Sequence, residues 1–168
     1  MAEPLASWAG PVPPLSLATI DQGRISITSR RDDVVIVHFF ATWCEACRPE
    51  LGALERLRST HKPRVAIVAI SVNEPASRVR RYFEKFPVGF PIALDADSSA
   101  ARRWGVFALP SSFVLDGSGA PLLKAAGEVD WDGAGVRALL TGPPRRRGAS
   151  TPNTIENTPT SLHKRTTP

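Results

Sequence analysis

The sequence predicts an α/β domain with a central mixed β-sheet flanked by helices. Two apolar runs of strand length, DDVVIVHFFA (32–41) and RVAIVAISV (64–72), carry apolar residues on both faces, which is typical of covered strands in the middle of a sheet. A segment with a helical period separates the two runs and favours parallel pairing between them. Two further strand-like runs, joined by a turn at 116–119, add an antiparallel pair and make the sheet mixed.

The other elements follow from composition and period in chain order. Residues 1–14 are rich in proline and predict an irregular arm, and LSLATIDQGRISIT (15–28) predicts a hairpin around an Asp-Gln-Gly turn. The remaining expected elements are a helix from Cys44 to about Ser59, a strand at 90–95, a helix at 98–106, two strands within 109–127 and a helix at 130–140.

A short helix is also expected between the strands at 64–72 and 90–95. Its sequence, PASRVRRYFEKF (75–86), has apolar residues at helical spacing. We expect Val79, Tyr82, Phe83 and Phe86 to face inward.

Positive charge is concentrated at the end of the chain. The net charge is +5, but from Pro143 onward five basic residues stand against one acidic residue, which leaves only +1 for residues 1–142. A nearly neutral fold offers no basic groove for nucleic acid. The last segment also has few large apolar residues, so we expect a disordered basic tail at 142–168 and a folded domain at 15–141.

The sequence contains no apolar run long enough to span a membrane. Its first residues, MAEPLASWAGPVPP, lack the basic and apolar regions of a signal peptide. On this evidence alone a cytoplasmic location stays open.

The only two cysteines, Cys44 and Cys47, are separated by two residues at the junction between a strand and a helix. A disulfide there closes a very short loop and restricts the unfolded chain little, so a purely structural bridge is disfavoured. Helix N-termini stabilise anions, and the thiolate is the reactive form of cysteine. The spacing therefore predicts a redox pair in which one sulfur attacks and the other resolves the mixed disulfide.

Metal binding is the alternative for the same two thiols. Structural zinc needs four ligands, and the three histidines, at positions 38, 61 and 163, are widely spaced. We expect no metal site and no cofactor. A copper-delivery module that holds copper by Cys44 and Cys47 alone stays open as the alternative function.

The segment VIVHFFATWCEACRPELGALERL (35–57) resembles the active-site segment of the thioredoxin superfamily, and in particular its TlpA/ResA-type branch of thiol–disulfide oxidoreductases. Three further stretches resemble the same branch in the same order: its N-terminal hairpin, its inserted helix and strand, and the segment with its cis-proline. They are residues 12–28, 71–106 and 109–119. The resemblance covers residues 11–141 and implies a thioredoxin-like fold.

The resemblance also implies site residues. Cys44 matches the exposed attacking thiol and Cys47 the buried resolving thiol. Trp43 matches the residue that packs beside the first cysteine, and Pro110 matches the cis-proline. Leu109, whose equivalent offers its backbone to the substrate peptide, stands where many members of the branch have Thr or Val.

Two further residues are candidates for proton transfer. Glu50 lies within the apolar stripe of the expected helix, so we expect its carboxyl to be desolvated, its pKa raised and its proton exchangeable with Cys47. The alternative is a residue at the edge of the stripe whose carboxyl extends to water. His38 stands where thioredoxins carry a buried acid. It is either a buried neutral imidazole held by hydrogen bonds or a proton relay.

The predicted function is a protein thiol–disulfide oxidoreductase. Its implied partners are protein disulfides and an upstream thiol donor, and its implied location is periplasmic or extracytoplasmic. The apoprotein of cytochrome c, a copper-site protein or a general periplasmic disulfide are all compatible substrates. Neither Glu45 nor Ala46 can donate a hydrogen bond to a Cys44 thiolate from its side chain, which favours a reductant. We expect a monomer. A thiol peroxidase is disfavoured because Thr42 is misplaced and no upstream proline accompanies it.

Overall fold

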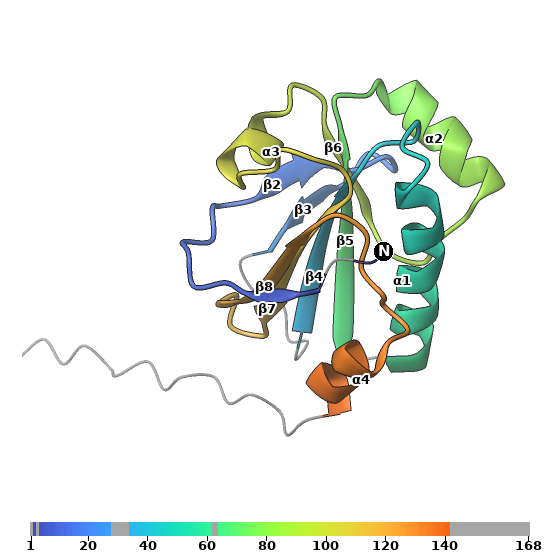
Figure 1. Ribbon diagram of the computed structural model, residues 1–168. Helices are drawn as coiled ribbons and strands as arrows, with labels where there is room; N and C mark the ends of the chain where they lie inside the picture. The colour runs from blue at the N-terminus through green and yellow to red at the C-terminus, as the bar shows by residue number, and fades with distance from the viewer. Residues whose placement is uncertain (1, 3, 28–33, 62–63, 142–168) are drawn as a thin grey trace, which may run out of the picture.

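The fold is built on a six-stranded mixed sheet. The computed structural model describes residues 2, 4–27, 34–61 and 64–141 (Figure 1). Across the sheet the strands follow the order β1 (Ala6–Ser7), β8 (Pro121–Ala126), β7 (Ser111–Asp116), β4 (Val34–Phe40), β5 (Val65–Val72) and β6 (Ile92–Asp95). The tail expected at 142–168 lies outside the described residues.

Strand β4 is the centre of the sheet. It pairs in parallel with β5 and antiparallel with β7, and all seven of its residues are buried. A strand covered on both faces has no polar side, which explains its nearly continuous apolar sequence. The predicted α/β class with a central mixed sheet is confirmed.

Helices cover both faces of this sheet. One face is covered by α1 (Cys47–His61), α2 (Ala76–Lys85) and α4 (Ala134–Thr141), and the other by α3 (Ser99–Arg103) with the hairpin β2 (Ser16–Ala18) and β3 (Arg24–Ser26). Along β4, Ile36 and Phe40 pack on the α1 side, whereas Val35 and Phe39 pack on the α3 side. His38 shares the period of Ile36 and Phe40, so its ring points toward α1. Among the described helices, none combines the length and the apolar character needed to cross a membrane.

The hairpin expected at 15–28 forms strands β2 and β3, which pair antiparallel. It attaches to the outer edge of β6, where Thr19 bridges Ala93 and the Ile20 N–H donates to the Ile92 carbonyl at 3.0 Å. Leu15 and Ile25 are buried in the core on the α3 side. The hairpin therefore covers a sheet edge that would otherwise be open.

The N-terminal arm differs from the expectation of irregular structure. Residues Ala6 and Ser7 form strand β1 on the free edge of β8, and Trp8 follows with its ring 5.1 Å from that of Phe113 and 6.0 Å from that of Trp104. An unpaired edge supplies backbone partners that composition does not reveal, and the half-buried Trp8 ring anchors the strand.

The expected inward face of the helix at 75–86 is partly wrong. Val79 and Phe83 are buried in α2 and Tyr82 is half-buried, but Phe86 is 41% exposed. The helix ends at Lys85 and Phe86 takes the non-helical angles of its C-cap, so helical spacing no longer sets the direction of the ring.

Candidate functional site

The two cysteines lie in the turn that joins β4 to α1. The helix begins at Cys47 and not at Cys44 as expected, because a turn comes first: the Cys44 N–H donates to the Ala41 carbonyl at 3.1 Å and the Cys47 N–H approaches the Cys44 carbonyl at 3.2 Å. Pro49 therefore lies in the first helical turn, where a backbone N–H has no partner within the helix to lose.

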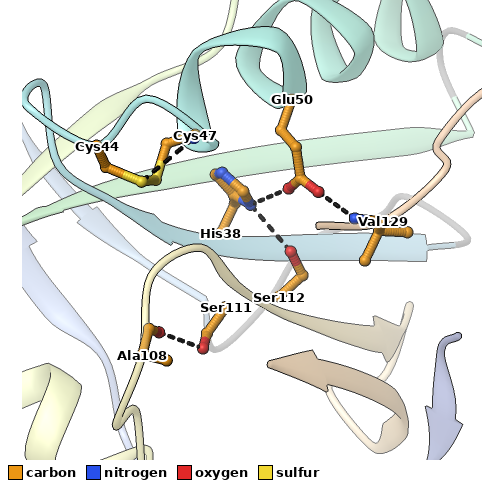
Figure 2. Close-up of polar contacts among 8 residues, drawn as sticks. All are labelled: His38, Cys44, Cys47, Glu50, Ala108, Ser111, Ser112 and Val129. Carbon is orange, nitrogen blue, oxygen red and sulfur yellow. Dashed lines mark hydrogen bonds and ion pairs between the residues drawn. A yellow bond between two sulfur atoms is a disulfide. The ribbon is translucent and has the colours of Figure 1, made fainter. Parts of the chain in front are cut away.

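Cys44 and Cys47 form a disulfide, with 2.09 Å between the sulfurs. Cys44 is 8% exposed and Cys47 is fully buried, so an incoming sulfur can reach only Cys44. The Cys47 N–H lies 3.2 Å from Cys44 Sγ (Figure 2). After reduction this N–H at the helix start would stabilise a Cys44 thiolate. These exposed fractions are those expected for an attacking Cys44 and a resolving Cys47.

Glu50 lies one turn after Cys47 on the inner face of α1 and is 4% exposed, which agrees with its place in the apolar stripe. Its carboxylate accepts a hydrogen bond from the Val129 N–H (Figure 2). Burial raises the pKa of this carboxyl to about 7, and the bond from Val129 opposes the rise. The group can therefore gain and lose a proton near neutral pH.

His38 lies fully buried below the helix start. Its Nδ1 is 2.9 Å from the Ser112 hydroxyl and 3.6 Å from Glu50 Oε2 (Figure 2). Burial lowers the pKa of the imidazole to about 3, so the ring is neutral in the physiological range. Its Nε2 has no hydrogen-bond partner among the described residues. The structure thus supports a buried, hydrogen-bonded neutral imidazole in contact with the Glu50 carboxyl.

The Leu109–Pro110 peptide bond is cis. Strand β7 begins directly after it, and Ser111 pairs with Phe39 near the end of β4. Strand β7 begins beside the last residues of β4, so this segment and Cys44 lie at the same end of the central strands. Pro110 is buried and Leu109 is half-buried.

Trp43 directly precedes Cys44 and is 66% exposed. A tryptophan open to water beside the reachable sulfur is available to contact a partner. The predicted site residues therefore divide into a buried group on the α1 side (His38, Cys47 and Glu50) and an outer group at this end of the central strands (Trp43, Cys44, Leu109 and Pro110).

Glu74 belongs to the site although no sequence pattern predicts its place there. Its carboxylate is 3% exposed and accepts hydrogen bonds from the Thr42 N–H at 2.8 Å, the Thr42 hydroxyl at 2.5 Å and the Ser71 hydroxyl at 2.7 Å. These bonds connect the end of β5 to the turn that carries Cys44. Glu74 and Thr42 are 32 positions apart in sequence, so no local motif could reveal their contact.

The central strand, the disulfide at the start of the following helix and the proline segment at the same end of the central strands place the chain in the class of thioredoxin-like proteins with a redox-capable disulfide. The sequence model of the AhpC/TSA family matches residues 9–120, which is more than half of the chain. The chain belongs to the AhpC/TSA family, and its relatives confirm the ResA/TlpA type within the thioredoxin superfamily.

Two of these relatives are bacterial proteins of similar identity. YneN, a thioredoxin-like protein of Bacillus subtilis, is 30% identical over 110 residues, which are 64% of this chain and 64% of YneN. ResA, a thiol-disulfide oxidoreductase of Geobacillus thermodenitrificans, is 31% identical over 108 residues, which are 64% of this chain and 62% of ResA. The chain thus covers slightly less than two thirds of each relative.

Solved structures share the fold. A thioredoxin-family thiol:disulfide interchange protein from Chlorobium tepidum is 28% identical with a TM-score of 0.65, covering 76% of this chain and 92% of that one. A secreted disulfide oxidoreductase from Mycobacterium tuberculosis is 18% identical with a TM-score of 0.63, covering 70% of this chain and 89% of that one. The second likeness shows the fold alone.

The titration of Glu50 leads to a first prediction. Ionised Glu50 can accept the proton of Cys47, so the rate at which Cys47 resolves a mixed disulfide should rise with pH through about 7. Glu50→Gln should remove this rise and slow resolution at pH 8 by about a hundredfold, the lower end of the usual range for general-base catalysis. Stopped-flow fluorescence of a preformed mixed disulfide measures the rate.

The control for this variant is Glu84→Gln, which makes the same chemical change at an exposed position of α2. It should keep the wild-type pH profile. A Glu50→Gln protein with an unchanged profile between pH 5 and 9 would assign Glu50 a structural role only.

The tether to Glu74 leads to a second prediction. Glu74→Gln replaces a bidentate acceptor by a group with one acceptor and one donor, so one of the two Thr42 bonds is lost. Stability should fall by about 1–3 kcal/mol because a buried donor is left unpaired. The freed turn should expose Cys44, so its alkylation by iodoacetamide should become faster while insulin reduction becomes slower.

Ser71→Ala is the matched control, because it removes one bond to Glu74 and keeps Thr42 tethered. Its alkylation and reduction rates should stay near those of the wild type. Alkylation and reduction rates of Glu74→Gln that change in the same direction would show that Glu74 does not position Cys44.

Proposed function

We propose that this protein is a protein thiol–disulfide oxidoreductase that works as a reductant. The observation that carries the proposal is the Cys44–Cys47 disulfide, with one reachable and one buried sulfur at a helix start. The name of the relative ResA supports the same activity. We assign the activity to residues 15–141, and we propose a monomer.

The proposed reaction proceeds in two exchanges. The Cys44 thiolate attacks one sulfur of the substrate disulfide, a mixed disulfide forms and the other substrate sulfur leaves as a thiolate. Cys47 then loses its proton to Glu50 and attacks Cys44 Sγ, which restores the Cys44–Cys47 disulfide and releases the second substrate thiolate. Two electrons pass to the substrate, and an upstream dithiol donor returns them by the reverse exchange.

The remaining site residues take supporting roles in this proposal. Trp43 and the backbone of the Leu109–Pro110 segment dock the peptide on either side of the substrate sulfur. His38 stays neutral and orients the Glu50 carboxyl. As a relay it would pass a proton from one ring nitrogen to the other without becoming charged.

We also propose an extracytoplasmic location, which the resemblance implies. The alternative function, copper delivery by the two sulfurs, has no specific support, whereas the name of the relative ResA describes a thiol-disulfide oxidoreductase.

The mechanism predicts different failures for the two cysteines. Reduced wild-type protein should reduce insulin, and Cys44→Ser should lose this activity because no reachable thiol is left. Cys47→Ser should attack once and stop as a mixed disulfide, which mass spectrometry detects. Full turnover by the Cys44→Ser protein would exclude the proposed mechanism.

The direction of electron flow is a separate prediction. The exposed Glu45 carboxylate beside Cys44 disfavours the thiolate, whereas the Cys47 N–H favours it. We therefore expect a reduction potential between about −270 mV, the value of thioredoxin, and about −180 mV, the value of protein disulfide isomerase. Equilibration with glutathione buffers measures it. A less negative potential would make the protein a disulfide donor or isomerase.

A further inference from the structure

A cleft of about 360 Å³ opens beside Cys44, between the turn that carries the cysteine and helix α2. Its size falls within the range of about 300–1,000 Å³ that is usual for ligand-binding clefts. Helix α2 lies next to the N-terminal end of α1 (Figure 1), so the cleft begins where a substrate sulfur must arrive.

The cleft is strongly basic. Arg48 comes from α1, and Arg78, Arg81 and Lys85 come from α2, whereas Glu45 is the one acid in the lining of the cleft. The lining therefore carries a surplus of three positive charges. On α2 the three cations follow one another at intervals of three and four residues, which places them on one helix face.

Nearby acids offset this charge only in part. The Glu74 carboxylate lies behind Thr42, which lines the cleft, and can offset at most one of the three surplus charges, because its hydrogen-bond partners Thr42 and Ser71 are neutral. Glu84 lines a different cleft, on another side of α2. Among the described residues, no ion pair involves any of the four cations.

The charge is also segregated within the domain. Residues 1–142 have a net charge of only +1, so a cleft with a surplus of three positive charges requires a net negative remainder. The positive charge of the cleft is therefore a local feature and does not follow from the net charge of the domain. The Arg48 guanidinium is moreover held 4.2 Å above the Phe86 ring, which fixes one charge at the wall of the cleft.

We propose that this cleft binds an acidic segment of the substrate protein, next to the cysteine that Cys44 attacks. The inference rests on the proposed oxidoreductase function and adds a substrate class to it. Guanidinium groups bind carboxylates through paired hydrogen bonds, and a basic cleft beside the reacting sulfur raises the local concentration of acidic chains. The exposed Trp43 and Phe86 side chains give the segment apolar contacts at the rim.

The test uses three synthetic peptides with the same intramolecular disulfide, flanked by Asp and Glu, by Ser, or by Lys. Stopped-flow fluorescence gives the second-order rate constant for each peptide with reduced full-length protein. The ratio of the acidic to the Lys peptide is the readout, because both react with the same Cys44 thiolate and its pKa cancels. We expect a ratio of at least about ten at low salt, which decreases at high salt as charges are screened.

The double variant Arg78→Glu/Arg81→Glu should lower this ratio at least about tenfold. Arg103→Glu makes the same kind of charge change beside the other face of the sheet, after Ala100 and Ala101 of α3, and should keep the wild-type ratio. Circular dichroism checks that both variants are folded. A ratio near one in the wild type, or equal effects of both variants, would overturn the proposal.

Glutathione disulfide, a small substrate with carboxylates, forms the last arm. We expect it to react more slowly than the acidic peptide. If it reacts faster and Arg78→Glu/Arg81→Glu abolishes the reaction, the cleft binds a small disulfide, and the proposal of a protein segment is overturned. Failure of the wild type to reduce any of the four disulfides would instead refute the oxidoreductase function itself.

Discussion

The burial of strand β4 is the constraint on which the site depends. All seven of its residues are buried, so the strand is held by neighbours on both edges and by side chains on both faces. Its last residues set the start of the turn that carries Cys44, and its partner β7 begins directly after Pro110. One rigid strand thus brings the Cys44 sulfur and the cis-proline segment together at its C-terminal end, as a preorganised site requires.

The same burial creates the unusual proton chemistry below the disulfide. His38 occupies a β4 position whose neighbours on the same face are apolar. Burying its polar ring there costs free energy, and the hydrogen bond with the Ser112 hydroxyl at 2.9 Å reduces that cost. Desolvation favours the neutral form of both groups, so it lowers the pKa of His38 to about 3 and raises that of Glu50 to about 7. Only Glu50 is therefore left to titrate where a thiol needs a base.

Much of the fold and of the candidate site could be predicted from sequence, because the patterns that indicate them lie within short stretches of the chain. Periodicity placed the buried strands, and helical spacing placed Glu50 on the inner face of α1. The missed features depend on tertiary contacts: the tether from Glu74 to Thr42, the pairing of β1 with the edge of β8, and the exposed ring of Phe86. A single sequence carries no record of which distant backbone or carboxylate will meet a given residue.

The basic cleft is hidden from sequence for a further reason. Its cations come from two helices separated by strand β5, and the total charge of residues 1–142 is only +1. The net charge of the chain does not reveal such a patch, because positive and negative residues elsewhere cancel it. An approaching partner, however, responds to the local electric field. The fold thus separates two electrostatic environments around one disulfide. The buried side holds a single titrating carboxyl next to Cys47, and the open side holds fixed cations next to Cys44. Because Glu50 is not among the residues that line the cleft, a change in the charge of the cleft leaves in place the carboxyl proposed to take the proton of Cys47.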